Sequence, residues 1–147
     1  MIVALTLSFF ISAQASIPVC DSLTNEEVAA VIGAVKSKQP LIDANTCTWS
    51  GERMMFSIMR TPESEPEVAT AILGSLKTRA RPGDVVTDEP GIGRQAVSEV
   101  MARGTRVSIV AVAGTTVWTI AVDHVYSGLK GEELLPKLRA IAKKLVR

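Results

Sequence analysis

The feature that most constrains this chain is its pair of cysteines, Cys20 and Cys47, the only two in its 147 residues. Together with a single histidine, His124, they fall short of the four ligands of a zinc site, and they lack the C-x-x-C spacing of redox motifs. We therefore expect a structural disulfide, which in a loop of this size stabilises a fold by about 3.5 kcal/mol. A reactive thiol and half of a metal site are the alternatives for the same residues.

An uncharged apolar run, Met1 to Ile11, leads into the small-residue sequence Ala13-Gln14-Ala15. This pattern is typical of an export signal followed by its cleavage site, so we expect residues 1–15 to be a signal peptide. The run spans about a dozen residues, whereas a membrane-spanning helix needs about 20. The sequence therefore favours a cleaved signal over an uncleaved anchor.

Two features qualify this signal. A lipoprotein would carry its lipid on Cys20, but the residue before a lipidated cysteine is normally small, and here it is Val19. A secretory signal normally starts with a basic region, whereas the first basic residue is Lys36, which predicts a natural start upstream of Met1. Because disulfides persist in oxidising compartments, the sequence predicts a periplasmic or secreted protein, with lipid anchoring less favoured.

Residues 16–147 have the length of a single domain, and no second core is expected. The chain carries 16 basic and 15 acidic residues, a net charge of +1. Nucleic-acid binders concentrate Lys and Arg on one face, so this near-neutral balance argues against a nucleic-acid partner. No pattern of a cofactor site stands out, and we expect no cofactor.

Capping signals predict two helices in the first half of the chain. Thr24 and Glu27 form a capping box at the start of the first helix. The stretch Ser64 to Glu67 repeats that pattern, with a proline in the first turn of the second helix. The second helix is expected to bury the apolar residues at helical spacing, Val68, Ile72 and Leu76.

Alternation of apolar and polar residues predicts five strands. They are residues 46–49, 53–60, 94–102, 105–112 and 115–123. The first two form a hairpin, and the last three form an antiparallel meander. We expect loops in the polar stretch up to Pro40 and in the Pro-, Gly- and Asp-rich stretch 79–93, and long loops are often functional.

A final amphipathic helix is predicted over residues 132–146. Its first turn is acidic and its last turn is basic, which suits the helix dipole. The predicted order is helix, two strands, helix, three strands, helix, or αββαβββα. Runs of strands separated by helices, without strict alternation, indicate the α+β class: a single, mainly antiparallel sheet with helices packed on it.

Four side chains are the candidates for a ligand pocket: Trp49, Trp118, Arg94 and Arg106. Alternation places both tryptophans on the buried side of their strands, where they either line an apolar pocket or pack in the core. The two arginines belong to the most basic part of the chain and suit an anionic ligand. The acidic residues among them favour a mixed solvated face instead.

The residues show no catalytic or metal-binding signature. Gly91 and Gly93 suggest a phosphate loop, but the third glycine and the strand-to-helix context are missing, so a turn is favoured. His124 beside Asp123 suggests a general base with its orienting acid, but neighbours on a strand point to opposite faces. A small hydrolase or transferase using His124 with a nearby acid is the alternative to a non-enzymatic protein.

The chain contains three short motifs: Cys20-Asp21-Ser22-Leu23-Thr24, Cys47-Thr48-Trp49-Ser50-Gly51 and Pro90-Gly91-Ile92-Gly93. Together they resemble a family of small exported bacterial domains of unknown function, many of them lipoproteins. Distant members of such groups look like the PsbP-like α/β/α sandwiches. The resemblance implies a non-enzymatic accessory or binding role in the cell envelope, with an envelope protein or a small ligand as partner. It supplies no catalytic residues.

Overall fold

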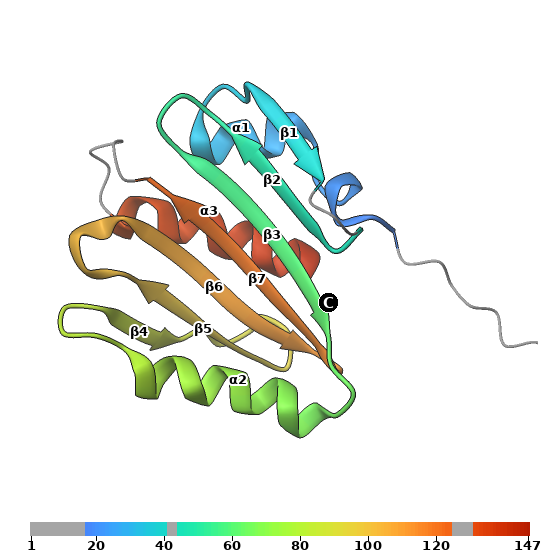
Figure 1. Ribbon diagram of the computed structural model, residues 1–147, viewed down its shortest axis with the longest axis vertical. Helices are drawn as coiled ribbons and strands as arrows, with labels where there is room; N and C mark the ends of the chain where they lie inside the picture. Colours follow the sequence, from blue (N-terminus) through green and yellow to red (C-terminus); the bar gives the residue numbers. More distant parts are fainter. Residues whose placement is uncertain (1–16, 41–43, 125–130) are drawn as a thin grey trace, which may run out of the picture.

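Seven strands form one antiparallel sheet in the computed structural model, which describes residues 17–40, 44–124 and 131–147 (Figure 1). The strands are β1 (Ser37–Pro40), β2 (Thr46–Ser50), β3 (Met55–Pro62), β4 (Val85–Asp88), β5 (Gln95–Val100), β6 (Arg106–Ala113) and β7 (Thr116–Asp123). The described residues also form helices α1 (Asn25–Ile32), α2 (Pro66–Arg79) and α3 (Gly131–Leu145), and the 3-10 turns η1 (Val19–Asp21) and η2 (Ala102–Gly104). The predicted α+β class is confirmed.

The strands lie in the order β1-β2-β3-β7-β6-β5-β4, so the two halves of the chain meet where β3 pairs with β7. This pairing runs from Met55 opposite Asp123 to Pro62 opposite Thr116. The predicted hairpin is formed by β2 and β3, and the predicted meander by β5, β6 and β7. The central contact therefore joins two units that are each local in sequence.

Two of the strands, β1 and β4, lie where the sequence predicted loops. The prediction of an irregular stretch over residues 79–93 is therefore corrected, because β4 lies within it. Both are edge strands of the sheet. All four residues of β1 are exposed, and β4 has one half-buried residue among three exposed ones. An edge strand without a buried face needs no apolar alternation, so the sequence carries no period-two signal there.

The helices cover the two faces of the sheet unequally. α1 and α3 lie behind the sheet in the view of Figure 1 and pack on the larger core, whereas α2 lies on the opposite face. The larger core contains Trp49, Phe56, Ile58, Ile109, Ile120 and Val122 from the sheet. On the other face, α2 packs on Val97, Val110, Val112 and Val117, which belong to β5, β6 and β7.

α2 uses a different stripe from the predicted one to contact the sheet. Ala69 and Leu73 are fully buried, whereas Val68 is 40% exposed. Ile72 and Leu76 pack at the flanks of the contact. The helix is thus rotated by about one residue from the prediction. The small side chain of Ala69 lets the helix axis approach the valines, which a stripe centred on Val68 would hold farther away.

The two predicted helix starts have different outcomes. In α1 the Thr24 hydroxyl accepts a hydrogen bond from the Glu27 amide at 3.2 Å, and the Glu27 carboxylate accepts one from the Thr24 amide at 2.9 Å, which confirms the capping box. α2 has Glu65 as its N-cap and no side-chain cap, so the predicted cap at Ser64 is wrong. Pro66 does occupy the first turn, where its missing amide hydrogen costs nothing.

α3 forms close to its predicted bounds and buries an apolar stripe that contains Leu134, Leu138, Ile141 and Ala142. Two ion pairs connect it to the rest of the fold: Lys144 binds Glu27 of α1, and Arg139 binds Glu89 in the segment after β4. The helix is therefore attached both to α1 and to the connection between β4 and β5.

Candidate functional site

The two tryptophans of the chain differ in exposure. Trp49 is fully buried, whereas Trp118 is partly buried and packs against the edge of the larger core. Trp118 lies in β7 directly opposite Arg60 of β3. The Arg60 guanidinium carbon is 5.7 Å from the centroid of the Trp118 ring, a cation–π contact. The pairing of β3 with β7 thus sets an indole and a guanidinium side by side on the face that also carries α1 and α3.

Hydrogen bonds fix the Arg60 side chain in this position. Its Nε and Nη2 atoms donate to Asn45 Oδ1 at 3.1 and 2.9 Å, and its Nη1 donates to the carbonyl of Ile17 at 3.2 Å. The Arg60 amide also donates to the Asn45 carbonyl at 2.8 Å. A guanidinium held by several partners loses little further freedom when a ligand contacts the ring beside it.

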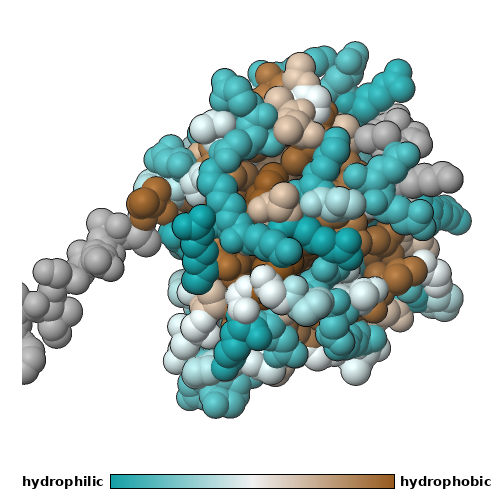
Figure 2. Space-filling view, turned by 180° about the vertical axis from the view of Figure 1, so that it is seen from behind, coloured by the Kyte–Doolittle hydropathy of each residue, from teal (hydrophilic) through white to brown (hydrophobic). Residues whose placement is uncertain are grey.

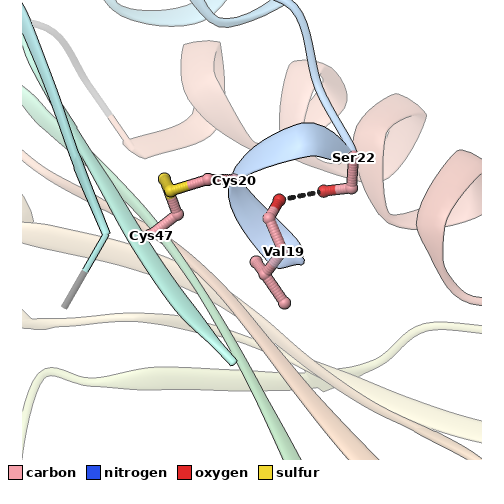
Figure 3. Close-up of a disulfide and its surroundings, with 4 residues drawn as sticks. All are labelled: Val19, Cys20, Ser22 and Cys47. Carbon is pink, nitrogen blue, oxygen red and sulfur yellow. Dashed lines mark hydrogen bonds between the residues drawn. A yellow bond between two sulfur atoms is a disulfide. The ribbon is translucent and has the colours of Figure 1, made fainter. Parts of the chain in front are cut away.

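The segment 17–22 forms one wall beside Trp118, and the predicted disulfide holds it there. Cys20 of η1 is bonded to Cys47 of β2, with the Cα atoms 5.1 Å apart, which confirms the disulfide (Figure 3). The Val19 amide donates to the Ala44 carbonyl at 2.8 Å, and the Ser22 hydroxyl donates to the Val19 carbonyl. The bridge therefore fixes a short N-terminal segment against the sheet.

Two adjoining depressions meet at Trp118, and we call them together the Trp118 hollow. They share Arg60, Trp118 and Leu145, and measure about 440 and 470 Å³. The first is also lined by Ile17, Val19, Asp21, Ser22 and Lys144, and the second by Asn45, Pro62, Ala113, Thr116 and Arg147. Volumes of this size lie within the range of small-molecule sites.

The charges around the Trp118 hollow are mainly positive. Arg60, Lys144 and Arg147 line it, and among its described lining residues Asp21 has the only acidic side chain. Lys144 is partly neutralised by its ion pair with Glu27. An indole surface beside several cationic groups suits a ligand with a flat apolar part and a negative charge.

The structure places the four predicted pocket residues in separate surroundings. Trp118 lines the hollow. Trp49 lies in the core, with its ring 5.6 Å from that of Phe56. Arg94 donates to the Pro66 carbonyl and the Thr70 hydroxyl of α2 at 3.1 and 2.8 Å. Arg106 binds both carboxylate oxygens of Asp123 at 3.1 Å. The four residues therefore lie in different parts of the fold and do not share one surface.

His124 lies just after β7 and outside the Trp118 hollow. The residue is only 3% exposed, and its amide donates to the Thr105 carbonyl at 2.9 Å. Burial lowers the pKa of His124 below its ordinary value, and the charge of Asp123 partly offsets this effect. Asp123 itself is engaged by Arg106. A buried imidazole with a depressed pKa offers little access to a substrate.

The Pro90 to Gly93 segment turns the chain into β5, as favoured from the sequence. Glu89, just before it, receives hydrogen bonds from Nε and Nη2 of Arg139, both at 2.7 Å. The Arg139 guanidinium holds the pKa of Glu89 below its ordinary value, although burial acts in the opposite direction. The turn is thereby attached to α3 by an ion pair.

A second, more apolar groove of about 330 Å³ lies between α1 and α3. Ala30, Val31, Ala140 and Ile141 line it, with Lys137 and the Glu27–Lys144 pair at its margins. The rear view of the molecule shows such apolar side chains between hydrophilic ones (Figure 2). The groove has no aromatic side chain among its described lining residues, and its fixed polar groups, Glu27 and Lys144, are already paired with each other. It therefore offers fewer means of orienting a ligand than the Trp118 hollow.

The sequence analysis found Trp118 but missed Arg60. Their contact depends on the register between β3 and β7, which no local pattern reveals. No helix among the described residues is long and apolar enough to cross a membrane. Comparisons with protein-family models, with curated proteins and with solved structures gave no match to this chain.

Proposed function

We propose that this chain is an exported, non-enzymatic binding domain of the bacterial cell envelope, and that the Trp118 hollow is its ligand site. Export is supported by the apolar start of the sequence and by the disulfide between Cys20 and Cys47. The resemblance of the sequence motifs to small exported domains supports an accessory role without catalysis.

The observation that carries this proposal is the fixed pair of Trp118 and Arg60. A partly exposed indole offers a flat apolar surface, and the clamped guanidinium beside it needs no reorganisation on binding. The expected ligand is a small molecule, or the end of a larger one, with a flat apolar group and a negative charge. The catalytic alternative has less support because His124 is buried away from the hollow.

The experiment uses 8-anilinonaphthalene-1-sulfonate, a flat apolar probe with one negative charge. We expect it to bind the oxidised protein and to accept excitation energy from Trp118. Trp118→Ala should weaken binding about tenfold or more, whereas Trp118→Phe, which keeps a flat ring, should weaken it less.

Val85→Ala is the matched control, because Val85 is 58% exposed on the edge strand β4 and this change removes an exposed apolar side chain elsewhere. Equal affinity in the wild-type protein and in Trp118→Ala would show that the probe binds elsewhere, and the proposed site would be rejected.

A further inference from the structure

The α2 side of the sheet is only half covered. The valines under α2 belong to β5, β6 and β7, and among the described residues no helix packs on that face of β1, β2 and β3. Figure 1 shows these three strands open toward the viewer. We call this region, the α2-side surface of β1, β2 and β3 with the adjoining edge of β7, the open half-sheet.

Exposed apolar side chains gather at this surface. Ile58 points to the larger core on the opposite face, so Met55 and Met59, at odd positions of β3, point to the open half-sheet. They are 42% and 44% exposed. Val68, which the rotation of α2 leaves 40% exposed, stands on the helix above the same face. Three of the five exposed large hydrophobic residues in the described chain therefore lie on one side of the sheet.

The outer surface of α2 is also unusual for a helix facing water. Its middle carries the exposed small residues Ala71 and Gly74, and a Cβ atom added to Gly74 would meet nothing within 4 Å. The charged residues lie toward the two ends, with Glu67 in the first turn and Lys77 and Arg79 in the last. We call the exposed side of α2 the ridge, and its middle, around Ala71 and Gly74, the crest. The crest has only small side chains, the first turn of the helix is acidic and the last turn is basic.

We propose that the open half-sheet is the interface of a homodimer, in which α2 of each copy lies on the open half-sheet of the other. A two-fold axis perpendicular to α2 places the two α2 helices antiparallel. Each ridge then fills the space beside the other, and the crest around Ala71 and Gly74 covers the exposed methionines of the partner. Such an interface is isologous, the commonest kind in soluble dimers.

Charge complementarity supports a second copy as the occupant. In the antiparallel arrangement the acidic first turn of α2, with Glu67, lies near the basic last turn of the other α2, with Arg79. The same pairing forms twice, once on each side of the two-fold axis. A parallel arrangement would place like charges together and is disfavoured.

The available area is sufficient for a weak dimer. A ridge about 10 Å wide and 21 Å long covers roughly 200 Å² of the partner's open half-sheet and buries a similar area of its own surface. The two ridges of the dimer therefore bury roughly 800 Å² in total, the size of a weak, transient contact and less than a standard interface. We therefore expect an association that depends on protein concentration.

The test is sedimentation velocity of the oxidised protein from micromolar to near-millimolar concentration. Gly74→Gln is the main variant, because it removes a helix-weakening glycine while adding bulk to the crest, so it should fold at least as well as the wild type. We expect its dimer dissociation constant to rise about tenfold or more, and Met59→Gln to act in the same direction. Val85→Gln, at an exposed apolar residue of β4, is the control and should leave association unchanged.

A charge exchange tests the antiparallel orientation. Glu67→Arg alone should weaken the dimer, and adding Arg79→Glu to it should restore association. Circular dichroism checks that each variant keeps its helix content. A wild-type protein that stays monomeric throughout the concentration range would overturn the proposal, as expected if another protein covers this face. A dimer that survives both Gly74→Gln and Met59→Gln would also overturn it.

Discussion

The Glu89 carboxylate receives two hydrogen bonds of 2.7 Å from Arg139, although the two residues are 50 positions apart. The Glu89 side chain is 5% exposed, whereas that of Arg139 is 39% exposed. A paired carboxylate of this kind favours its charged form, so the pKa of Glu89 lies below its ordinary value of 4.5. The ion pair thus makes part of the stability depend on pH.

Glu89→Gln should lower the free energy of unfolding at pH 7 by about 1–3 kcal/mol, because Arg139 loses its charged acceptor. In the wild type, the ion pair contributes fully to the free energy of unfolding above the unfolded-state pKa of Glu89. This contribution is lost as pH falls through the lower folded-state pKa of Glu89. Urea unfolding at neutral and at acidic pH checks this, and the difference between the two proteins should shrink in acid. Asp88→Asn is the control, since its ion pair with Lys77 is exposed. A difference that is constant across pH would contradict the assignment.

Replacing both cysteines, as Cys20→Ser with Cys47→Ser, should lower the free energy of unfolding by about 3.5 kcal/mol. It should also make release of the segment 17–22 easier, because ordering each residue costs about 1–2 kcal/mol. The buried Val19 side chain and the hydrogen bonds of Ile17 and Val19 would then have to hold this wall without the disulfide. Hydrogen exchange at the Val19 amide reports the release, since that amide is bonded to the Ala44 carbonyl. The amide of Val28, in α1, is the internal control. Unchanged protection at Val19 would show that the disulfide is not what holds the wall.

His124 should titrate below its ordinary pKa of 6.5, because burial disfavours the imidazolium. Because protons then bind more tightly to His124 in the unfolded chain, protonation favours unfolding. The stability that the neutral, buried imidazole allows is present at neutral pH and is lost as pH falls below the unfolded-state pKa of His124. The chain has one histidine, so a single imidazole signal in the NMR spectrum follows the titration. The urea-unfolded chain gives the reference value, and a folded-state pKa above it would refute the prediction.

Gly91 and Gly93 provide a matched pair of substitutions in one turn. Both have positive φ, +78° and +55°, so alanine is strained at either position. At Gly93 a Cβ would also lie 2.5 Å from the Val112 carbonyl oxygen, whereas at Gly91 it would meet nothing within 4 Å. We expect Gly91→Ala to cost about 1 kcal/mol and Gly93→Ala clearly more, as measured by thermal unfolding. Equal effects would show that the turn relaxes without resistance at Gly93.

Local signals predicted much of the fold. The capping box at Thr24, the β2–β3 hairpin and the β5–β6–β7 meander are each specified by residues close in sequence. β1 and β4 were missed because exposed edge strands show no alternation. The rotation of α2 was missed because capping and periodicity do not reveal which side of a helix the sheet accepts.

The candidate site was predicted only in part, for the same reason. Trp118 stands out in the sequence as a large aromatic residue on a strand, but Arg60 becomes its neighbour only through the pairing of β3 with β7. From the sequence, Arg94 and Arg106 are expected either to face an anionic ligand or to belong to a mixed solvated face. The structure instead gives them partners in α2 and β7.

The central position of the β3–β7 pair has a consequence for how the chain folds. Until β7 is available, β3 presents an unpaired edge in the middle of the future sheet, although its own hairpin is already complete. An unpaired edge of this kind is open to pairing with other chains, and closing a contact over so long a stretch of chain is slow. We therefore expect the first half of the protein to be most prone to aggregation before the last strand, β7, has paired with β3.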